Sequence, residues 1–235
     1  WNTEWLRIRD IGTTEEADYL MTMHGLFWDF PQTFSSRNSA GIRPRSAYLK
    51  DIGDLARWND RLVFGCDDSA QKEFLNKRKV KGNIEGPGQS NSNLWFTPLT
   101  KPDELGPSTA TGAVWLRDKV NGNEPSEPFL FAGWSQRTAW ILNDGKTSAT
   151  FDFEVDRKGN GTWISIKKIT AEPGLAASVT FTAQERGEWV RVTSDKATTA
   201  TVAFTYTDQT RFMGLDDALF EGLAAVDSDV YSGGL

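Results

Sequence analysis

The sequence predicts an all-β protein built as an antiparallel meander, either a β-propeller or part of one, with a β-sandwich as the alternative. Strand signals are numerous and helix signals few, because Gly, Asn, Asp and Pro interrupt runs of β-branched and aromatic residues at short intervals. Turn residues join these runs, with Asn143-Asp144-Gly145 between two of them and residues 156–161 between the next pair.

The runs that favour strands extend over most of the chain. Within 151–155 the apolar side chains alternate with acids, as in a sheet with one solvated face. The short connections around them make 129–169 a predicted four-stranded meander, which is the unit of one propeller blade. The predicted strands are 5–8, 19–23, 61–65, 94–97, 113–116, 129–132, 138–142, 149–155, 162–169, 178–182, 189–193 and 201–207.

A short echo within the chain favours the propeller over the sandwich. Residues 4–8, Glu-Trp-Leu-Arg-Ile, recur at 188–192 as Glu-Trp-Val-Arg-Val, and a Thr-Thr pair follows each copy. Propellers are made of such self-similar units of about 40–50 residues, although a chance match between two hairpins would look the same. The 235 residues would then form a small propeller or a fragment of a larger one.

We expect one all-β domain over 1–235, with two segments that differ from the strands. Residues 71–88 are rich in Lys, Arg, Asn and Gly and predict a long surface loop, and 101–110 predict a shorter one. Residues 213–235 predict a C-terminal tail. Because the chain begins with Trp1, we expect that its natural start has been removed, so the lack of a signal segment carries no information on export.

Composition excludes several classes of protein. The net charge of -6 gives no broad attraction to nucleic acid, and no run approaches the roughly 20 apolar residues of a membrane-spanning helix. Cys66 is the only cysteine, which excludes an intrachain disulfide and a zinc site of several thiolates. Ten tryptophans exceed what a core tends to need, and indoles are common on sugar-binding surfaces as well as in propeller blades.

The single histidine is the first candidate for chemistry. His24 ends a strand before an aromatic cluster, and any imidazole base must be this residue, although a lone histidine is more often structural. Arg37, Arg43 and Arg45 follow, and their guanidinium groups could hold an acidic sugar through bidentate hydrogen bonds. The competing interpretation is that they pair with nearby acids such as Asp29, Asp51 and Asp54.

Two further stretches are candidates for binding. Residues 58–68 predict a hairpin that starts at Trp58 and ends in Asp67-Asp68, which could bind a cation or act as acid and base, although such pairs are usually turn formers. Polar residues including Asn91 and Asn93 stand directly before Trp95, and amides followed by an indole can hydrogen-bond and stack on a sugar.

Other chemistries lack a motif. There is no Gly-x-Ser-x-Gly elbow and no Gly-rich phosphate loop, which argues against a standard hydrolase triad and against nucleotide chemistry. A structural calcium would be compatible with a propeller, but no ligand series with a recognisable spacing is present. Residues 160–162 match the pattern for N-glycosylation, but matches to this short pattern are frequent by chance.

Four segments, 24–31, 41–44, 57–68 and 89–96, together resemble secreted bacterial proteins of polysaccharide breakdown, the β-propeller polysaccharide lyases and glycosidases. The resemblance covers about the first half of the chain. It implies a secreted or periplasmic protein in which His24 is the base, Tyr48 the acid, and Arg43 or Arg45 the clamp on a uronate carboxylate. Without such a clamp, the proton next to the carboxylate is too weakly acidic for an imidazole.

Three hypotheses on function follow. The first is an enzyme that degrades an extracellular, acidic polysaccharide by β-elimination. The second is a sugar-binding or scaffolding propeller without catalysis, with a binding face made of Trp28, Trp58, Asn93 and Trp95. The third is hydrolysis by two carboxylates, and the candidates are Asp29, Asp54, Asp67 and Asp68.

Overall fold

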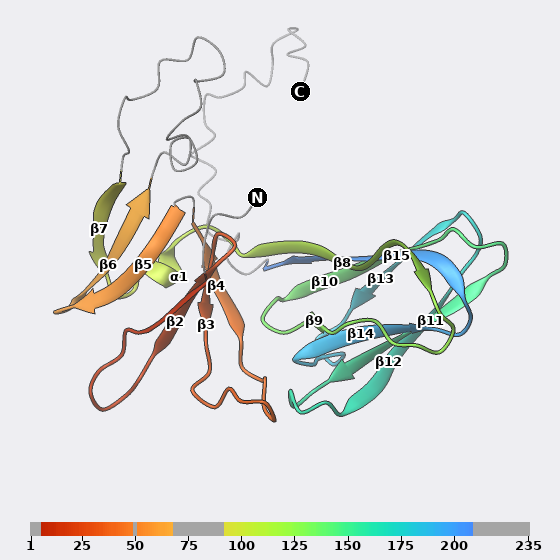
Figure 1. The fold of residues 1–235 in the computed structure, drawn as a ribbon, viewed down its shortest axis with the longest axis horizontal. Helices are drawn as coiled ribbons and strands as arrows, with labels where there is room; N and C mark the ends of the chain where they lie inside the picture. Colours follow the sequence, from red (N-terminus) through yellow and green to blue (C-terminus); the bar gives the residue numbers. More distant parts are fainter. Residues whose placement is uncertain (1–5, 49–50, 68–91, 209–235) are drawn as a thin grey trace, which may run out of the picture.

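The computed structural model of the chain describes residues 6–48, 51–67 and 92–208 (Figure 1). Within these ranges the protein is all-β, with antiparallel strands in four sheets and one short helix, α1 (Lys101–Glu104). The described part contains no helix with the length and hydropathy needed to cross a membrane. The predicted loop 71–88 and tail 213–235 lie outside the described residues.

Two meander sheets form the N-terminal half. In the first meander sheet the strands lie side by side in the order in which they occur along the chain: β1 (Arg7–Asp10), β2 (Tyr19–Met23), β3 (Leu26–Asp29) and β4 (Arg43–Ala47). The second meander sheet follows in the same way with β5 (Asp51–Trp58), β6 (Arg61–Asp67) and β7 (Ser92–Pro98).

The C-terminal half is a sandwich of two four-stranded sheets, ordered β13-β10-β15-β8 and β12-β11-β14-β9. Four antiparallel pairs of strands are nested one inside the next, as in one long hairpin folded on itself. The pairs are β8 with β15, β9 with β14, β10 with β13, and β11 with β12. This is the strand order of a jelly roll. The bounds are β8 (Thr109–Val120), β9 (Phe129–Leu130), β10 (Gln136–Asn143), β11 (Ala149–Asp156), β12 (Trp163–Ala171), β13 (Ala176–Phe181), β14 (Trp189–Ser194) and β15 (Thr198–Thr207).

The hairpin of β2 and β3 is buried on both faces. Because side chains alternate along a strand, Leu20 and Phe27 enter the core between the two meander sheets, while Met21 and Trp28 enter the core of the sandwich. Trp28 meets Trp134 of the sandwich edge-on, with ring centroids 5.9 Å apart. The first meander sheet is therefore a layer shared by both cores.

The blade predicted over 129–169 is wrong. β9 lies in one sheet, β10 in the other, and β11 and β12 in the first again, because successive jelly-roll strands cross between the layers. The similar segments 4–8 and 188–192 are not a structural repeat either. The strand that follows β1 pairs with β1, whereas the strand that follows β14 lies in the opposite sheet. The alternation in 129–169 and the repeated Glu-Trp motif are both typical of any half-buried strand, so neither shows which strands pair.

The meanders lie instead in the N-terminal half, where strands were predicted near β1, β2, β6 and β7 but β3, β4 and most of β5 were missed. In β4 a proline and two arginines hide the strand signal, and β3 has three consecutive buried residues where alternation was sought. The loop predicted at 101–110 contains α1 and the first residues of β8. The described residues form no closed ring of sheets, so an all-β antiparallel fold is confirmed and the propeller is not shown.

Trp28→Ala should destabilise the protein by about 3–5 kcal/mol, the usual cost of removing a large aromatic side chain from a core. Trp28 is only 5% exposed, and its Nε1 donates to the Met23 carbonyl at 3.0 Å. Leu116→Ala is the control, because Leu116 is 70% exposed and should change stability by less than about 0.5 kcal/mol. Urea unfolding measures both, and equal midpoints would show that β3 is not a shared layer.

Candidate functional site

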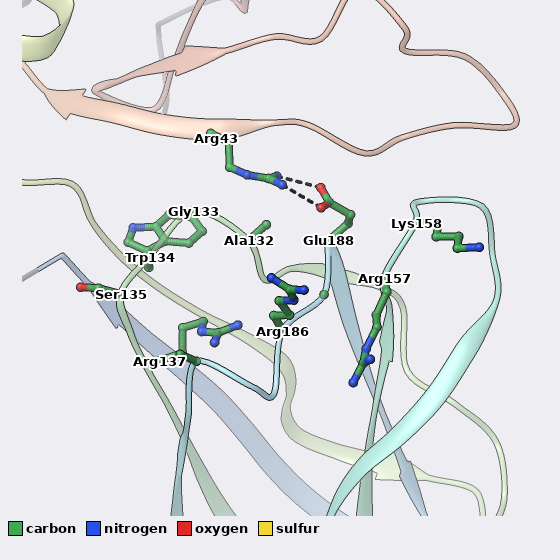
Figure 2. A pocket seen from close by; sticks show the side chains of 12 residues that line it. Arg43, Ala132, Gly133, Trp134, Ser135, Arg137, Arg157, Lys158, Arg186 and Glu188 are labelled. Atoms are coloured by element: carbon green, nitrogen blue, oxygen red, sulfur yellow. Dashed lines mark hydrogen bonds and ion pairs between the residues drawn. The ribbon is translucent and has the colours of Figure 1, made fainter.

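A pocket of about 660 Å³ opens at one end of the sandwich (Figure 2). Three loops meet there, those between β9 and β10, β11 and β12, and β13 and β14. Every second loop of an antiparallel sandwich reaches the same end, so the jelly-roll order itself brings these loops together. The lining residues are Arg43, Ala132, Gly133, Trp134, Ser135, Arg137, Arg157, Lys158, Ala183, Arg186, Gly187 and Glu188.

Strand β4 of the first meander sheet closes one side of the pocket through Arg43. Its Nη1 and Nη2 donate to the two oxygens of Glu188, each at 2.7 Å, and the Gly41 amide adds a third bond at 2.8 Å (Figure 2). Burial raises the pKa of Glu188, but these hydrogen bonds outweigh it and hold the pKa below its ordinary value. Glu188, the one carboxylate among the described residues of the lining, is thus ionised and neutralised.

Backbone contacts fix β4 and the segment before it against the loops. Gly133 has a φ of 98°, and a Cβ there would lie 2.3 Å from Cδ of Pro44. Ser39 donates from its amide to the Gly159 carbonyl at 2.8 Å and accepts from Nε1 of Trp189 at 2.9 Å. The wall that carries Arg43 is therefore held in place from both sides.

Arg137 is the unusual residue of the pocket. It lies on the inner face of β10 and is only 5% exposed, with its guanidinium 4.1 Å from the ring centre of Phe131. Nη2 donates to the Thr182 carbonyl at 3.0 Å, but Nε has no partner and no carboxylate pairs with the group among the described residues. Burial lowers its pKa, and the nearby Tyr206 and Glu185 offset this only in part.

Two more buried polar groups next to Arg137 are unsatisfied within the described residues. They are Nε1 of Trp134, which lines the pocket, and the hydroxyl of Tyr206, the residue opposite Arg137 on β15. The Trp134 and Tyr206 rings lie 4.9 Å apart. An unmade hydrogen bond on a buried group costs about 1–3 kcal/mol, so a cluster of such groups indicates a ligand rich in acceptors.

The rim adds three cations: Arg157 and Lys158 from the β11–β12 loop, and Arg186 from the β13–β14 loop (Figure 2). None forms an ion pair with another residue in the described ranges. Among the described residues, the lining includes no histidine, tyrosine, cysteine or aspartate. The cations that do line the pocket can bind anionic oxygen atoms.

The residues predicted for proton transfer lie elsewhere. His24 is exposed and has a φ of 54°, and with Gly25 it forms the two-residue turn between β2 and β3. Tyr48 is close in the backbone, since its amide donates to the Gly25 carbonyl at 2.9 Å, but its ring is buried against Phe27. Neither residue lines the pocket.

Of the predicted carboxylate clamp, only Arg43 reaches the pocket. Arg45 instead forms an ion pair with Asp103 at 2.8 Å and lies 3.5 Å from Asp29. For Arg45, therefore, the competing interpretation of ion pairs with nearby acids holds. Burial raises the pKa of Asp29, against the field of Arg45. Trp28 is in the core, and Arg37 is exposed.

The other predicted sugar contacts belong to the second meander sheet. Trp58 is 60% exposed beside Phe96, and Trp95 packs half-buried on Phe64. Asn91 and the side chain of Asn93 lie outside the described residues, as does Asp68. Of the acids proposed for hydrolysis, Asp54 pairs with Arg9 at 2.8 Å. Within the described ranges, no three His, Cys, Asp or Glu side chains gather as metal ligands would.

Sequence reasoning missed Arg137, although a signal was present. Alternation along β10 places Arg137 on the same face as Ala139 and Ile141, so a cation could be expected on the inner side of the sheet. Arg157, Lys158 and Arg186 gave no such signal, because loop cations are common and only the jelly-roll order brings the three together.

Comparison with known proteins gives little. No protein-family model and no curated protein matches the chain. Among solved structures, the PBSX exported protein XepA shares 14% identity over 55% of this chain and 50% of its own, with a TM-score of 0.33. A Bacillus endospore appendage protein shares 18% over 44% and 91% (TM-score 0.30), and a carbohydrate-binding module of the β-sandwich superfamily shares 8% over 87% and 96% (TM-score 0.24). Likeness at this level supports no argument on function.

Glu188→Gln should make the free energy of unfolding depend less on pH in the acid range. The pKa of Glu188 is lowered on folding, so its stabilisation is complete above about pH 4.5 and is lost as the pH falls through the folded-state value. Glutamine does not titrate, so the variant should be about 1–2 kcal/mol less stable near pH 7 and should approach the parent protein in acid.

Urea unfolding from about pH 7 to about pH 3 measures this convergence. Glu154→Gln is the control, since Glu154 pairs with Arg191 on the outer surface of the sandwich rather than in the pocket. A gap between Glu188→Gln and the parent that stayed constant with pH would contradict the assignment.

Proposed function

We propose that this chain binds an acidic poly- or oligosaccharide outside the cell, with carboxylate or sulfate groups of the sugar held in the pocket at the end of the sandwich. The observation that carries the proposal is Arg137, a buried cation with a free Nε and no carboxylate partner in the described structure. A guanidinium matches two oxygens of such a group, and that ligand would supply the missing partner.

Three features favour a sugar over a simple anion. The volume of about 660 Å³ is within the range of small-molecule sites and far larger than one anion requires. The rim cations Arg157, Lys158 and Arg186 extend the positive charge beyond Arg137, as a chain with repeated negative charges needs. Trp134 and Ser135, an indole and a hydroxyl of the kinds that contact sugars, line the same wall.

Binding without catalysis is the better supported of the hypotheses. Elimination from a uronate needs a base beside the clamped carboxylate. His24 and Tyr48 do not line the pocket, and Glu188 is occupied by Arg43.

We also propose that the two meander sheets are neighbouring blades of a propeller. Each is an antiparallel meander and the two share a core, as adjacent blades do. The outer face of the second meander sheet exposes Trp58, Leu94 and Phe96 at 60%, 61% and 45%, and Trp58 and Phe96 are in ring contact. A further blade would cover this apolar face.

Titration with polygalacturonate, alginate, dextran and single-stranded DNA tests the binding proposal. The triple variant Arg157→Ala/Lys158→Ala/Arg186→Ala should lose at least about tenfold in affinity for the two polyuronates, equivalent to about 1.4 kcal/mol. Glu188→Gln should bind them more tightly, because Arg43 is then no longer neutralised. Lys146→Ala, a single cation in the β10–β11 turn, should leave the affinity unchanged.

Arg137→Met separates a binding role from a structural one in the same titrations. Replacing a buried charge by an apolar side chain is often neutral or stabilising, so the melting temperature should stay or rise while polyuronate binding is lost. Equal affinity for DNA, or full affinity in this variant, would refute a sugar site. Ultraviolet absorbance of an unsaturated uronate, abolished by His24→Ala, would restore the elimination hypothesis.

The proposal of a further blade can be tested by hydroxyl-radical footprinting. The protein is taken in the form that its source organism produces. Trp58 and Trp140 are 60% and 52% exposed here, so they should be oxidised at similar rates if nothing covers either. A further blade should protect Trp58, Leu94 and Phe96 and leave Trp140 reactive. Oxidation of Trp58 as fast as that of Trp140 would exclude a blade on this face.

A further inference from the structure

Part of the outer face of the sheet β13-β10-β15-β8 is an uncharged surface of hydroxyl groups around one tryptophan. Alternation directs Arg137, Ala139 and Ile141 of β10 inward and the residues between them outward. The outward residues in the three cross-strand rows that end at Ala113 of β8, here named the threonine face, are Thr109, Thr111, Ala113, Gln136, Thr138, Trp140, Ser178, Thr180, Ala203, Thr205 and Thr207; the next row, Leu142 with Ala176 and Thr201, is not part of it.

The register arranges these side chains in rows across the strands. Thr138 lies between Thr180 and Thr205, and its Oγ1 is 3.3 Å from that of Thr180. In the next row, Trp140 lies between Ser178 and Ala203 and is 52% exposed. Described residues therefore leave this indole open to solvent at the centre of the sheet. The charged residues of β8 lie beyond the register shift that ends this row.

The opposite sheet of the same sandwich is an internal comparison. Its outer face carries ion pairs, Lys168 with Asp152 at 3.1 Å and Arg191 with Glu154 at 2.9 Å. Charged residues make up 25% of the chain, and yet the three rows of the threonine face contain none, whereas Lys119 lies on the same sheet beyond the register shift, opposite Thr199. The opposite face also carries a threonine pair, Thr150 with Thr170 at 3.0 Å, so the difference between the two faces lies in the charges. A surface without charges is complementary to a neutral partner.

We propose that the threonine face binds a neutral polysaccharide, with Trp140 stacked on a sugar ring and the surrounding hydroxyls bonded to the hydroxyls of the chain. A sugar hydroxyl donates and accepts, as Thr, Ser and Gln side chains do, and an indole offers a flat apolar surface to the C–H face of the ring. Strands about 4.8 Å apart set these groups in a regular array for a repeating chain. This site is separate from the pocket and does not rest on it.

Sedimentation with insoluble cellulose, chitin and starch granules tests the proposal. The parent protein should bind at least one of them at high salt, because no charge takes part. Trp140→Ala should lower that affinity at least about tenfold, as loss of a central aromatic contact does. Thr205→Glu should weaken it as well, by placing an uncompensated charge among neutral hydroxyls.

Trp163→Ala and Thr170→Glu are the matched controls, since both residues lie on β12 of the opposite sheet, and both should bind as the parent does. Full binding by Trp140→Ala, or no binding of any neutral polymer by the parent protein, would overturn the proposal. So would concentration-dependent dimerisation abolished by Trp140→Ala, because the face would then serve a second copy. The Arg157/Lys158/Arg186 variant should still sediment, so the two sites can fail independently.

Discussion

The burial of one hairpin on both faces determines the rest of the structure. Leu20 and Phe27 close the core between the meander sheets, while Met21 and Trp28 complete the core of the sandwich. Two sets of strands that could each fold around their own core are therefore joined by packing as well as by the chain. Loss of either set of contacts exposes the other face of the same hairpin, so we expect the two halves to unfold together.

This packing also positions the pocket. β4 is the last strand of the first meander sheet, and docking of that sheet brings Arg43 across the loops at the end of the sandwich to Glu188. Without Arg43, Glu188 would place a negative charge beside Arg137, Arg157 and Arg186. The ion pair stabilises the contact between the halves, and the same pair keeps the lining of the pocket cationic.

The sequence predicted the class of fold and most strand positions, but not how the strands are connected in space. Strand periodicity is local, as in residues 151–155, whereas the alternation of 129–169 between two sheets depends on contacts with β14 and β15 far along the chain. For the site, the sequence predicted Arg43 as a clamp on a sugar carboxylate, and the structure pairs it with a carboxylate of the protein itself. Its partner Glu188 is 145 residues away, and no local pattern connects them.

Charge distribution explains how an acidic protein can bind an acidic ligand. The net charge is -6, so a polyanion is repelled at long range in dilute salt. At physiological ionic strength the field decays within about 8 Å, and the ligand then responds to the nearest charges alone. Those around the pocket are Arg137, Arg157, Lys158 and Arg186, none of which has a carboxylate partner within the described structure. Added salt should thus have two opposing effects, reducing the overall repulsion while weakening the local attraction. A polyuronate should bind best at intermediate ionic strength, whereas a ligand attracted by a uniformly basic surface would bind less with every addition of salt.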